Sequence, residues 1–87
     1  MIFGADAPAL RLLAGKLEQI SGRLATIESS VSARNETIPW VGADADRFKG
    51  TWADASAPSM RDASRVLKEA AQEIRGDAQR QEQISSI

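Results

Sequence analysis

The sequence contains no cysteine, no histidine and no tyrosine. The absence of cysteine excludes disulfides, a thiolate metal site and a thiol nucleophile. The absence of histidine removes the commonest general base and the commonest ligand of transition metals. Carboxylates remain, but no pair of them stands in a sequence context that suggests burial. We therefore expect a protein that is not an enzyme and that uses no cofactor or metal.

Strong charge and long apolar runs are also lacking. The 87 residues carry a net charge of −1, so no excess of positive charge suggests nucleic acid or an anionic membrane as a partner. No apolar run approaches the roughly 20 residues that span a bilayer. The stretch MIFGADAPAL has no basic region, and Asp6 and Pro8 interrupt its apolar part. We therefore expect no cleavable secretory leader.

The first half of the chain has the pattern of one long helix, about residues 7–37. Asp6 and Pro8 suit the first turn of a helix, and the residue before Pro39 is pushed away from α geometry. Branched aliphatic residues recur between these ends at alternating spacings of three and four, as in a heptad repeat. The small residues Ala14 and Ser21 flank this stripe on one side, and Lys16 and Arg23 on the other. The stripe consists of Leu10, Leu13, Leu17, Ile20, Leu24, Ile27 and Val31.

The second half predicts another helix, about residues 43–84, after a turn at 38–42. Asp44 and Asp46 fall in its first turn, where the helix dipole favours negative charge. They lack the later glycine and glutamate of a calcium loop, so a metal site is a poor interpretation. Trp52 and Ala63 are eleven residues apart, which breaks the heptad register. We therefore expect a bend or local unwinding near residues 54–58, at Pro58, with a break into two helices as the alternative. The apolar face comprises Phe48, Trp52, Met60, Ala63, Leu67, Ala70 and Ile74, widened by Val66, Ala71 and Ala78.

These two helices predict an all-α fold, a single antiparallel hairpin domain over residues 1–87. The connection of about five residues is too short for any arrangement except antiparallel neighbours. With equal rise in both helices, the polar segment after about residue 76 would overhang without a partner in the chain. Two alanine-rich helices bury little apolar surface, so we expect the hairpin to pair with another helical protein. A marginal monomer remains the alternative.

The turn contains Trp40 and Gly42, and two interpretations of this pair remain open. In the first, the indole covers the open end of the hairpin and the glycine shapes the loop. In the second, the indole is a recognition element for a partner. A partly exposed indole can serve both purposes.

The segment Trp40-Val41-Gly42 between two helices, followed by ADADRF and a helix with Trp52, resembles the WXG-motif family of small type VII secretion substrates, the early-secreted-antigen-like proteins. The C-terminal DAQRQEQIS is also similar to the way many actinobacterial members end. The resemblance covers essentially the whole chain.

The resemblance implies helical hairpins that pair into four-helix bundles, as homodimers or as heterodimers with a paralogous protein. Such proteins are exported without a leader from the cytoplasm to the cell surface or medium by a membrane-embedded type VII ATPase. The resemblance makes Trp40 and Gly42 half of a composite export signal. The other half is a Tyr-x-x-x-Asp/Glu motif in the partner's tail.

The chain departs from the family pattern in its C-terminal part, which has no tyrosine and no aromatic residue after Trp52. Either a partner supplies the tail motif, or the chain stays in the cytoplasm as a coiled-coil adaptor or chaperone for a larger helical protein or toxin. We expect the first. In both cases the partners are proteins, with no nucleic acid and no small-molecule substrate.

Overall fold

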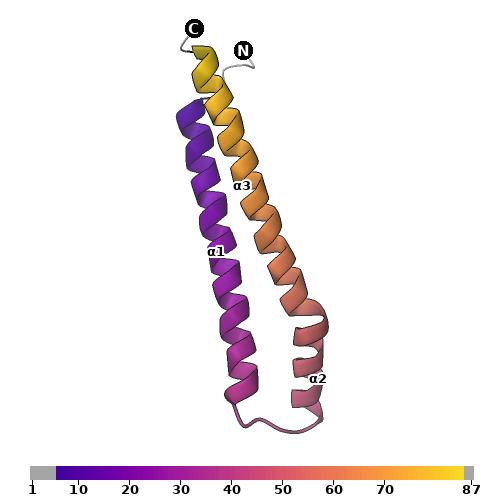
Figure 1. Ribbon diagram of the computed structural model, residues 1–87. Coiled ribbons are helices and arrows are strands. Elements are labelled where there is room, and N and C mark those ends of the chain that lie inside the picture. Colours follow the sequence, from indigo (N-terminus) through magenta and orange to yellow (C-terminus); the bar gives the residue numbers. More distant parts are fainter. Residues whose placement is uncertain (1–5, 86–87) are drawn as a thin grey trace.

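The computed structural model describes residues 6–85 and shows two antiparallel helical arms (Figure 1). The first arm is α1 (Ala7–Thr37). The second arm contains α2 (Ala43–Thr51), the π-helix η2 (Trp52–Ser56) and α3 (Ala57–Ser85), which follow one another without a gap. No strand occurs in residues 6–85, and the predicted all-α helical hairpin is confirmed.

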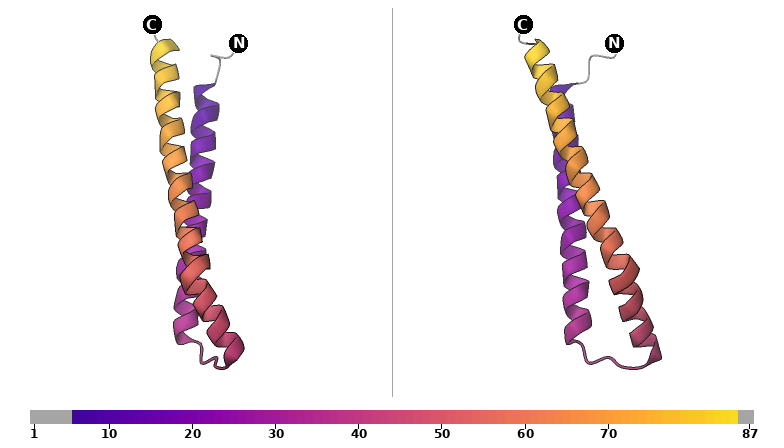
Figure 2. Two further views of the ribbon diagram at one scale, coloured as in Figure 1. Left: turned by 90° about the vertical axis from the view of Figure 1, so that its right-hand side faces the viewer. Right: turned by 45° about the vertical axis from the view of Figure 1, so that its right-hand side comes forward.

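The hairpin is an extended rod. Its principal dimensions are 66 × 17 × 15 Å and its radius of gyration is 19.2 Å, whereas a compact chain of this length would have about 12 Å. Figure 2 shows the arms lying together near the chain ends and diverging towards the loop that joins α1 to α2. A shape this elongated leaves much of each helix without a neighbour in the chain.

The ends of α1 follow from local chemistry. Asp6 is the N-cap residue, with Pro8 in the first turn. The Asp6 carbonyl accepts the Leu10 N–H at 2.9 Å, but the Asp6 side chain makes no capping hydrogen bond. At the other end Ile38 is extended, as expected for the residue before a proline.

The seam between the arms is built from small side chains. Ala14, Ser21 and Glu28 on α1 are buried and recur every seven residues. On α3 the matching positions are Ala57, Ser64, Ala71 and Ala78, of which the alanines are buried and Ser64 is half-buried. We call these seven residues the inner row. Ser21 and Ser64 join the arms directly: Ser21 Oγ donates to the Ser64 carbonyl at 2.7 Å, and Ser64 Oγ donates to the Ser21 carbonyl at 2.9 Å.

The inner row differs from the stripe of large residues that the heptad pattern emphasised. Leu10, Leu17, Leu24 and Val31 flank it and are half-buried, and no large side chain among the described residues is fully buried. The physical reason is that alanine and serine let two helix backbones approach closely, which leucines at the same positions would prevent. The small flank noted at Ala14 and Ser21 is thus the part of α1 that faces α3.

The expected irregularity near Pro58 is the π-helix that directly precedes this proline. The Ala57 N–H donates to the Trp52 carbonyl five residues back, which is the hydrogen-bond pattern of a π turn. The extra residue per turn absorbs the register change between Trp52 and Ala63. The second arm therefore remains continuous.

The segment after residue 76 overhangs less than expected. Helix α3 continues to Ser85, and its end extends past the start of α1 (Figure 1). Ala78, however, is fully buried, and Glu82 pairs with Arg11 of α1. The prediction assumed equal rise on both sides of a turn centred near residue 40. The divergence of the arms and the wider π turn use up extra residues of the second arm, so α3 lies alongside α1 as far as Ala78.

Candidate functional site

One side of the hairpin is polar. Glu18, Arg75 and Glu82 each stand four positions after an inner-row residue, and Arg11 stands three positions before Ala14. Arg11 Nη2 lies 2.6 Å from Glu82 Oε1, and Arg75 Nη2 lies 2.7 Å from Glu18 Oε2. Both ion pairs join α1 to α3. These contacts place the two charged rows on the same side of the seam, which we call the polar side.

The ion pairs shift the pKa values of their members. The hydrogen bond from Arg75, and then its charge, lower the pKa of Glu18. The hydrogen bond from Arg11 likewise lowers the pKa of Glu82. Because these groups are largely exposed, each pair adds little to stability. Their main effect is to favour one register of α3 on α1.

The other side is apolar. On both helices, large side chains stand four positions before inner-row residues, which places them on the side of the seam opposite to the charged rows. Each residue of an α-helix is turned by about 100° from the one before it. Leu13, Ile20 and Ile27 therefore lie farther round α1 from the seam, and they are 46%, 43% and 49% exposed. We call this surface the apolar face. It comprises Leu10, Leu13, Leu17, Ile20, Leu24, Ile27 and Val31 on α1, and Met60, Ala63, Leu67, Ala70 and Ile74 on α3.

The apolar face accounts for almost all predicted interface residues. Its members from α1 are half-buried beside the seam and exposed beyond it. Of those from α3, Ala63 is exposed and the other four are half-buried. A row that is half-covered by its own hairpin and continues into exposed branched side chains is suited to burial by a second helical element. The remaining predicted residues, Phe48 and Trp52, lie elsewhere, at the loop end.

The loop end presents the Trp-x-Gly segment at the surface. Trp40 is 41% exposed and Val41 is 87% exposed. Gly42 has φ 120°, a value that side-chain-bearing residues rarely adopt, so the glycine is needed to start α2 in this direction. The Gly42 carbonyl accepts the Asp46 N–H at 3.0 Å. The loop is thus fixed by α2 while Trp40 stays partly exposed.

Aromatic contacts support Trp40 from α2. The Trp40 and Phe48 rings are 5.8 Å apart and tilted, and the Phe48 and Trp52 rings are 6.3 Å apart and stacked. Lys49 Nζ donates to the Trp40 carbonyl at 3.3 Å. The packing interpretation and the recognition interpretation of Trp40 are therefore compatible, since its ring lies next to Phe48 and the residue is still partly exposed.

A partly buried polar network links the arms near this end. Trp52 Nε1 donates to Ser32 Oγ at 2.9 Å, and Ser32 Oγ donates to Glu28 Oε2 at 2.6 Å. Arg61 Nε donates to Glu28 Oε1 at 2.8 Å. The hydrogen bond from Arg61, followed by that from Ser32, lowers the pKa of Glu28. The π turn of η2 starts at Trp52, and the network holds that residue against α1.

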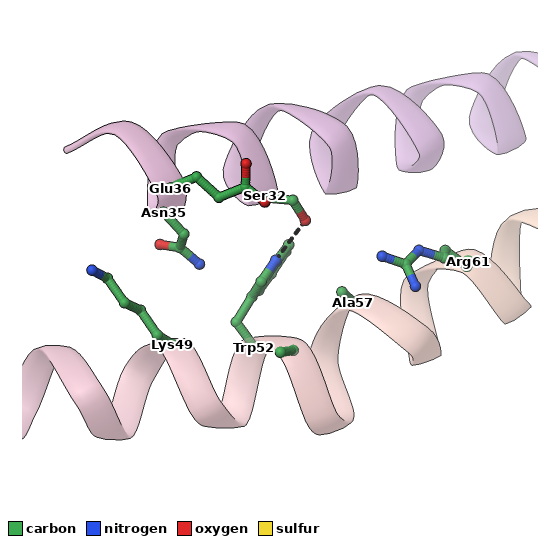
Figure 3. A pocket seen from close by; sticks show the side chains of 8 residues that line it. Ser32, Asn35, Glu36, Lys49, Trp52, Ala57 and Arg61 are labelled. Carbon is green, nitrogen blue, oxygen red and sulfur yellow. Dashed lines mark hydrogen bonds between the residues drawn. The ribbon is translucent and has the colours of Figure 1, made fainter.

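A cavity of about 330 Å³ lies beside this network and is lined in part by Ser32, Trp52 and Arg61 (Figure 3). Trp52 stands within it and Lys49 and Arg61 extend from the second arm. On the α1 side, Asn35 Nδ2 is buried without a hydrogen-bond partner. The lining carries both signs of charge, because Glu36 contributes a carboxylate. The cavity is a consequence of the diverging arms, and its mixed lining does not single out a class of ligand.

Sequence reasoning missed the Glu28–Ser32–Trp52–Arg61 network and the inner row. The inner row had a signal, namely small residues spaced by seven at Ala14 and Ser21 and again at Ala71 and Ala78. The network had none, because Glu28 and Arg61 are 33 positions apart and no sequence pattern links the two positions.

Two further properties concern residues 6–85. None of the helices in this range is long and apolar enough to cross a membrane. No cluster of acidic side chains in the same residues is arranged to hold a metal ion. The chain matches no protein-family model, no curated protein and no solved structure.

Proposed function

We propose that this chain is a small helical interaction module that pairs through its apolar face into a four-helix bundle and is exported, or co-exported, by a type VII secretion system. The single observation that carries the pairing is the row of exposed Leu13, Ile20 and Ile27 beside a seam that contains no fully buried large side chain. The partner is a second copy or a paralogous hairpin.

The export part rests on the loop. The Trp-x-Gly segment supports it by combining an accessible indole with a glycine whose φ of 120° fixes the loop. Trp40 and Gly42 would form half of a composite signal that the secretion ATPase recognises. The tail half would come from a partner, because the chain has no tyrosine. The protein would be cytoplasmic before export and secreted or surface-located afterwards.

Export is tested by Trp40→Ala in a bacterium that has a type VII machine and a paralogous partner. We expect loss of the protein from the culture medium while helix content and oligomeric state stay unchanged. The matched control is Val41→Ala, which alters the neighbouring, more exposed position and should be exported normally. Normal export of a folded Trp40→Ala chain would refute the signal.

The second candidate is a coiled-coil adaptor or chaperone that stays in the cytoplasm with a larger helical protein or toxin. The lack of tyrosine favours this second function, because the chain cannot supply the tail half of the export signal itself. In the same assay this function predicts retention of both the wild type and Val41→Ala, together with co-purification of the larger partner from the cell fraction.

A further inference from the structure

We propose that the loop end of the hairpin opens: α2 and the loop move away from α1 about the π turn, as one unit. The hydrogen bond from Trp52 Nε1 to Ser32 Oγ, at 2.9 Å, holds the closed form that the structure shows, and we call it the latch. The opening changes the position of the Trp-x-Gly segment relative to α1. It is a motion within one chain, so it depends on neither pairing nor export.

The contact between the two arms changes in kind along the seam. Near the chain ends it consists of Ala14, Ala71 and Ala78, whose exposed fraction is 0%. Towards the loop the inner row reaches Glu28, and Asn35 stands seven positions further on. Small apolar side chains are held by close packing, whereas buried polar side chains need a hydrogen-bond partner for each polar atom. The loop end is therefore held closed chiefly by hydrogen bonds.

The closed form leaves one polar atom without such a partner. Asn35 Nδ2 is buried and makes no hydrogen bond. Figure 3 shows the Asn35 side chain extending from α1 into the cavity that Lys49 and Trp52 also line. A buried donor without an acceptor raises the free energy of the state that buries it, and contact with water removes this penalty. Asn35 thus disfavours the closed form while the latch favours it.

The π turn is placed to act as the hinge. It interrupts the regular hydrogen-bond pattern of the second arm between α2 and α3. Gly50 stands two positions before it, and a Cβ at Gly50 would meet nothing within 4 Å outside its own helix. Packing therefore does not require this glycine, and its effect is to weaken the helix there. Among the residues of α2, all of which the structure describes, only Ala45 is buried. Opening would expose little apolar surface besides the Trp52 indole.

The loop is attached to α2, so the two move together. The rings of Trp40 and Phe48 are 5.8 Å apart, and Lys49 Nζ donates to the Trp40 carbonyl at 3.3 Å. The Gly42 carbonyl accepts the Asp46 N–H at 3.0 Å. These contacts lie within the moving unit and persist when it opens. The Trp40 indole therefore keeps its place on α2 and changes its position relative to α1.

The test measures distances between two spin labels by pulsed electron paramagnetic resonance. The chain has no cysteine of its own, and the loop-end pair is Ala33→Cys on α1 and Arg47→Cys on α2, both at exposed positions. The matched control pair is Gln19→Cys and Gln72→Cys, which are exposed positions of α1 and α3. Labelled protein is diluted with unlabelled chain, so that each distance is measured within one molecule.

Ser32→Ala removes the acceptor of the latch. We expect the ratio of open to closed molecules to rise roughly tenfold, about the effect of one hydrogen bond, so that a longer distance appears at the loop-end pair. Adding Asn35→Leu, which replaces the unsatisfied amide by an apolar group of similar size, should lower this ratio by a similar factor. Adding Gln79→Leu instead, at an exposed site of α3, should leave the ratio unchanged.

A single short distance at the loop-end pair of Ser32→Ala would overturn the proposal, as would a ratio that Asn35→Leu does not lower. A longer distance at the control pair as well would show that the whole hairpin comes apart, which also contradicts a hinge at the π turn. Circular dichroism completes the test, because α2 stays helical while it moves. Loss of helix content in Ser32→Ala would mean that α2 unfolds instead of opening.

Discussion

At the scale of single residues, side-chain size decides which helix face meets which. The heptad pattern correctly identified the large residues Leu10 to Val31 as one face of α1, because apolar spacing is readable from sequence. It did not reveal that alanines and serines would form the seam. Either the stripe of large residues or the row of small residues on α1 could have packed against α3, and the small residues allow the closer approach. Which of the two packs can be seen only from the positions of both helices together, as in the Ser21–Ser64 contact.

A residue-scale prediction concerns Glu28, whose pKa is lowered chiefly by the hydrogen bond from Arg61. A carboxylate with a lowered pKa stabilises the folded state at neutral pH, and this contribution is lost as the pH falls below its ordinary value of 4.5 towards the folded value. Glu28→Gln should therefore melt at a lower temperature than the wild type at pH 7. The two melting temperatures should converge as the pH is lowered through this window.

The comparison is made by thermal unfolding monitored by circular dichroism between pH 7 and pH 2. Glu73→Gln, a change at an exposed site of α3, is the control and should keep a nearly constant offset from the wild type. A pH-independent difference between Glu28→Gln and the wild type would show that the carboxylate charge of Glu28 does not contribute to the network.

At the scale of elements, the sequence indicated where regular structure would be disturbed but left two forms of the disturbance open. The eleven residues from Trp52 to Ala63 and the proline at 58 predicted a bend or local unwinding. The structure has a single π turn at Trp52–Ser56 in an uninterrupted arm. Either a π turn or a kink can accommodate one surplus residue in a helix, and tertiary contacts determine which of the two forms. Here Trp52 gains the hydrogen bond to Ser32 on α1.

An element-scale prediction follows from this surplus residue. Deletion of Ala53 should convert η2 into α-helix and turn α2 by about 100° relative to α3. The Trp52 indole would then leave Ser32, and the fully buried Ala45 would rotate away from its contacts. We expect a lower melting temperature and loss of the Trp52 indole N–H signal from its hydrogen-bonded position in ¹⁵N–¹H spectra. Ala53→Ser, which keeps the length, is the control. An unshifted indole signal in the deletion variant would mean that the π turn does not position Trp52.

At the scale of the whole molecule, the two sides of the hairpin differ in polarity. The seam and the ion pairs of the polar side complete the fold, and they use neither Leu13, Ile20 nor Ile27. Large apolar side chains that the fold does not use favour the proposed second molecule. The thin alanine core had already predicted a partner, and this stays a prediction. The sequence alone could not indicate the face, because that depends on which side of the seam the charged rows take.

The corresponding prediction is that Ile27→Lys separates folding from association. The substitution places a charge in the proposed interface, while position 27 is already 49% exposed in the hairpin. We expect unchanged helix content and a roughly 30-fold weaker complex, equivalent to the loss of about 2 kcal/mol at an interface. Because association stabilises the folded state by mass action, the melting temperature of the wild type should rise with protein concentration, and that of Ile27→Lys should begin to rise only at higher concentration. Leu12→Lys, which also replaces an exposed branched residue of α1 but lies outside the apolar face, should behave like the wild type. Sedimentation equilibrium and concentration-dependent melting measure both effects, and equal weakening by the two lysines would mean that the apolar face is not the surface through which this hairpin pairs.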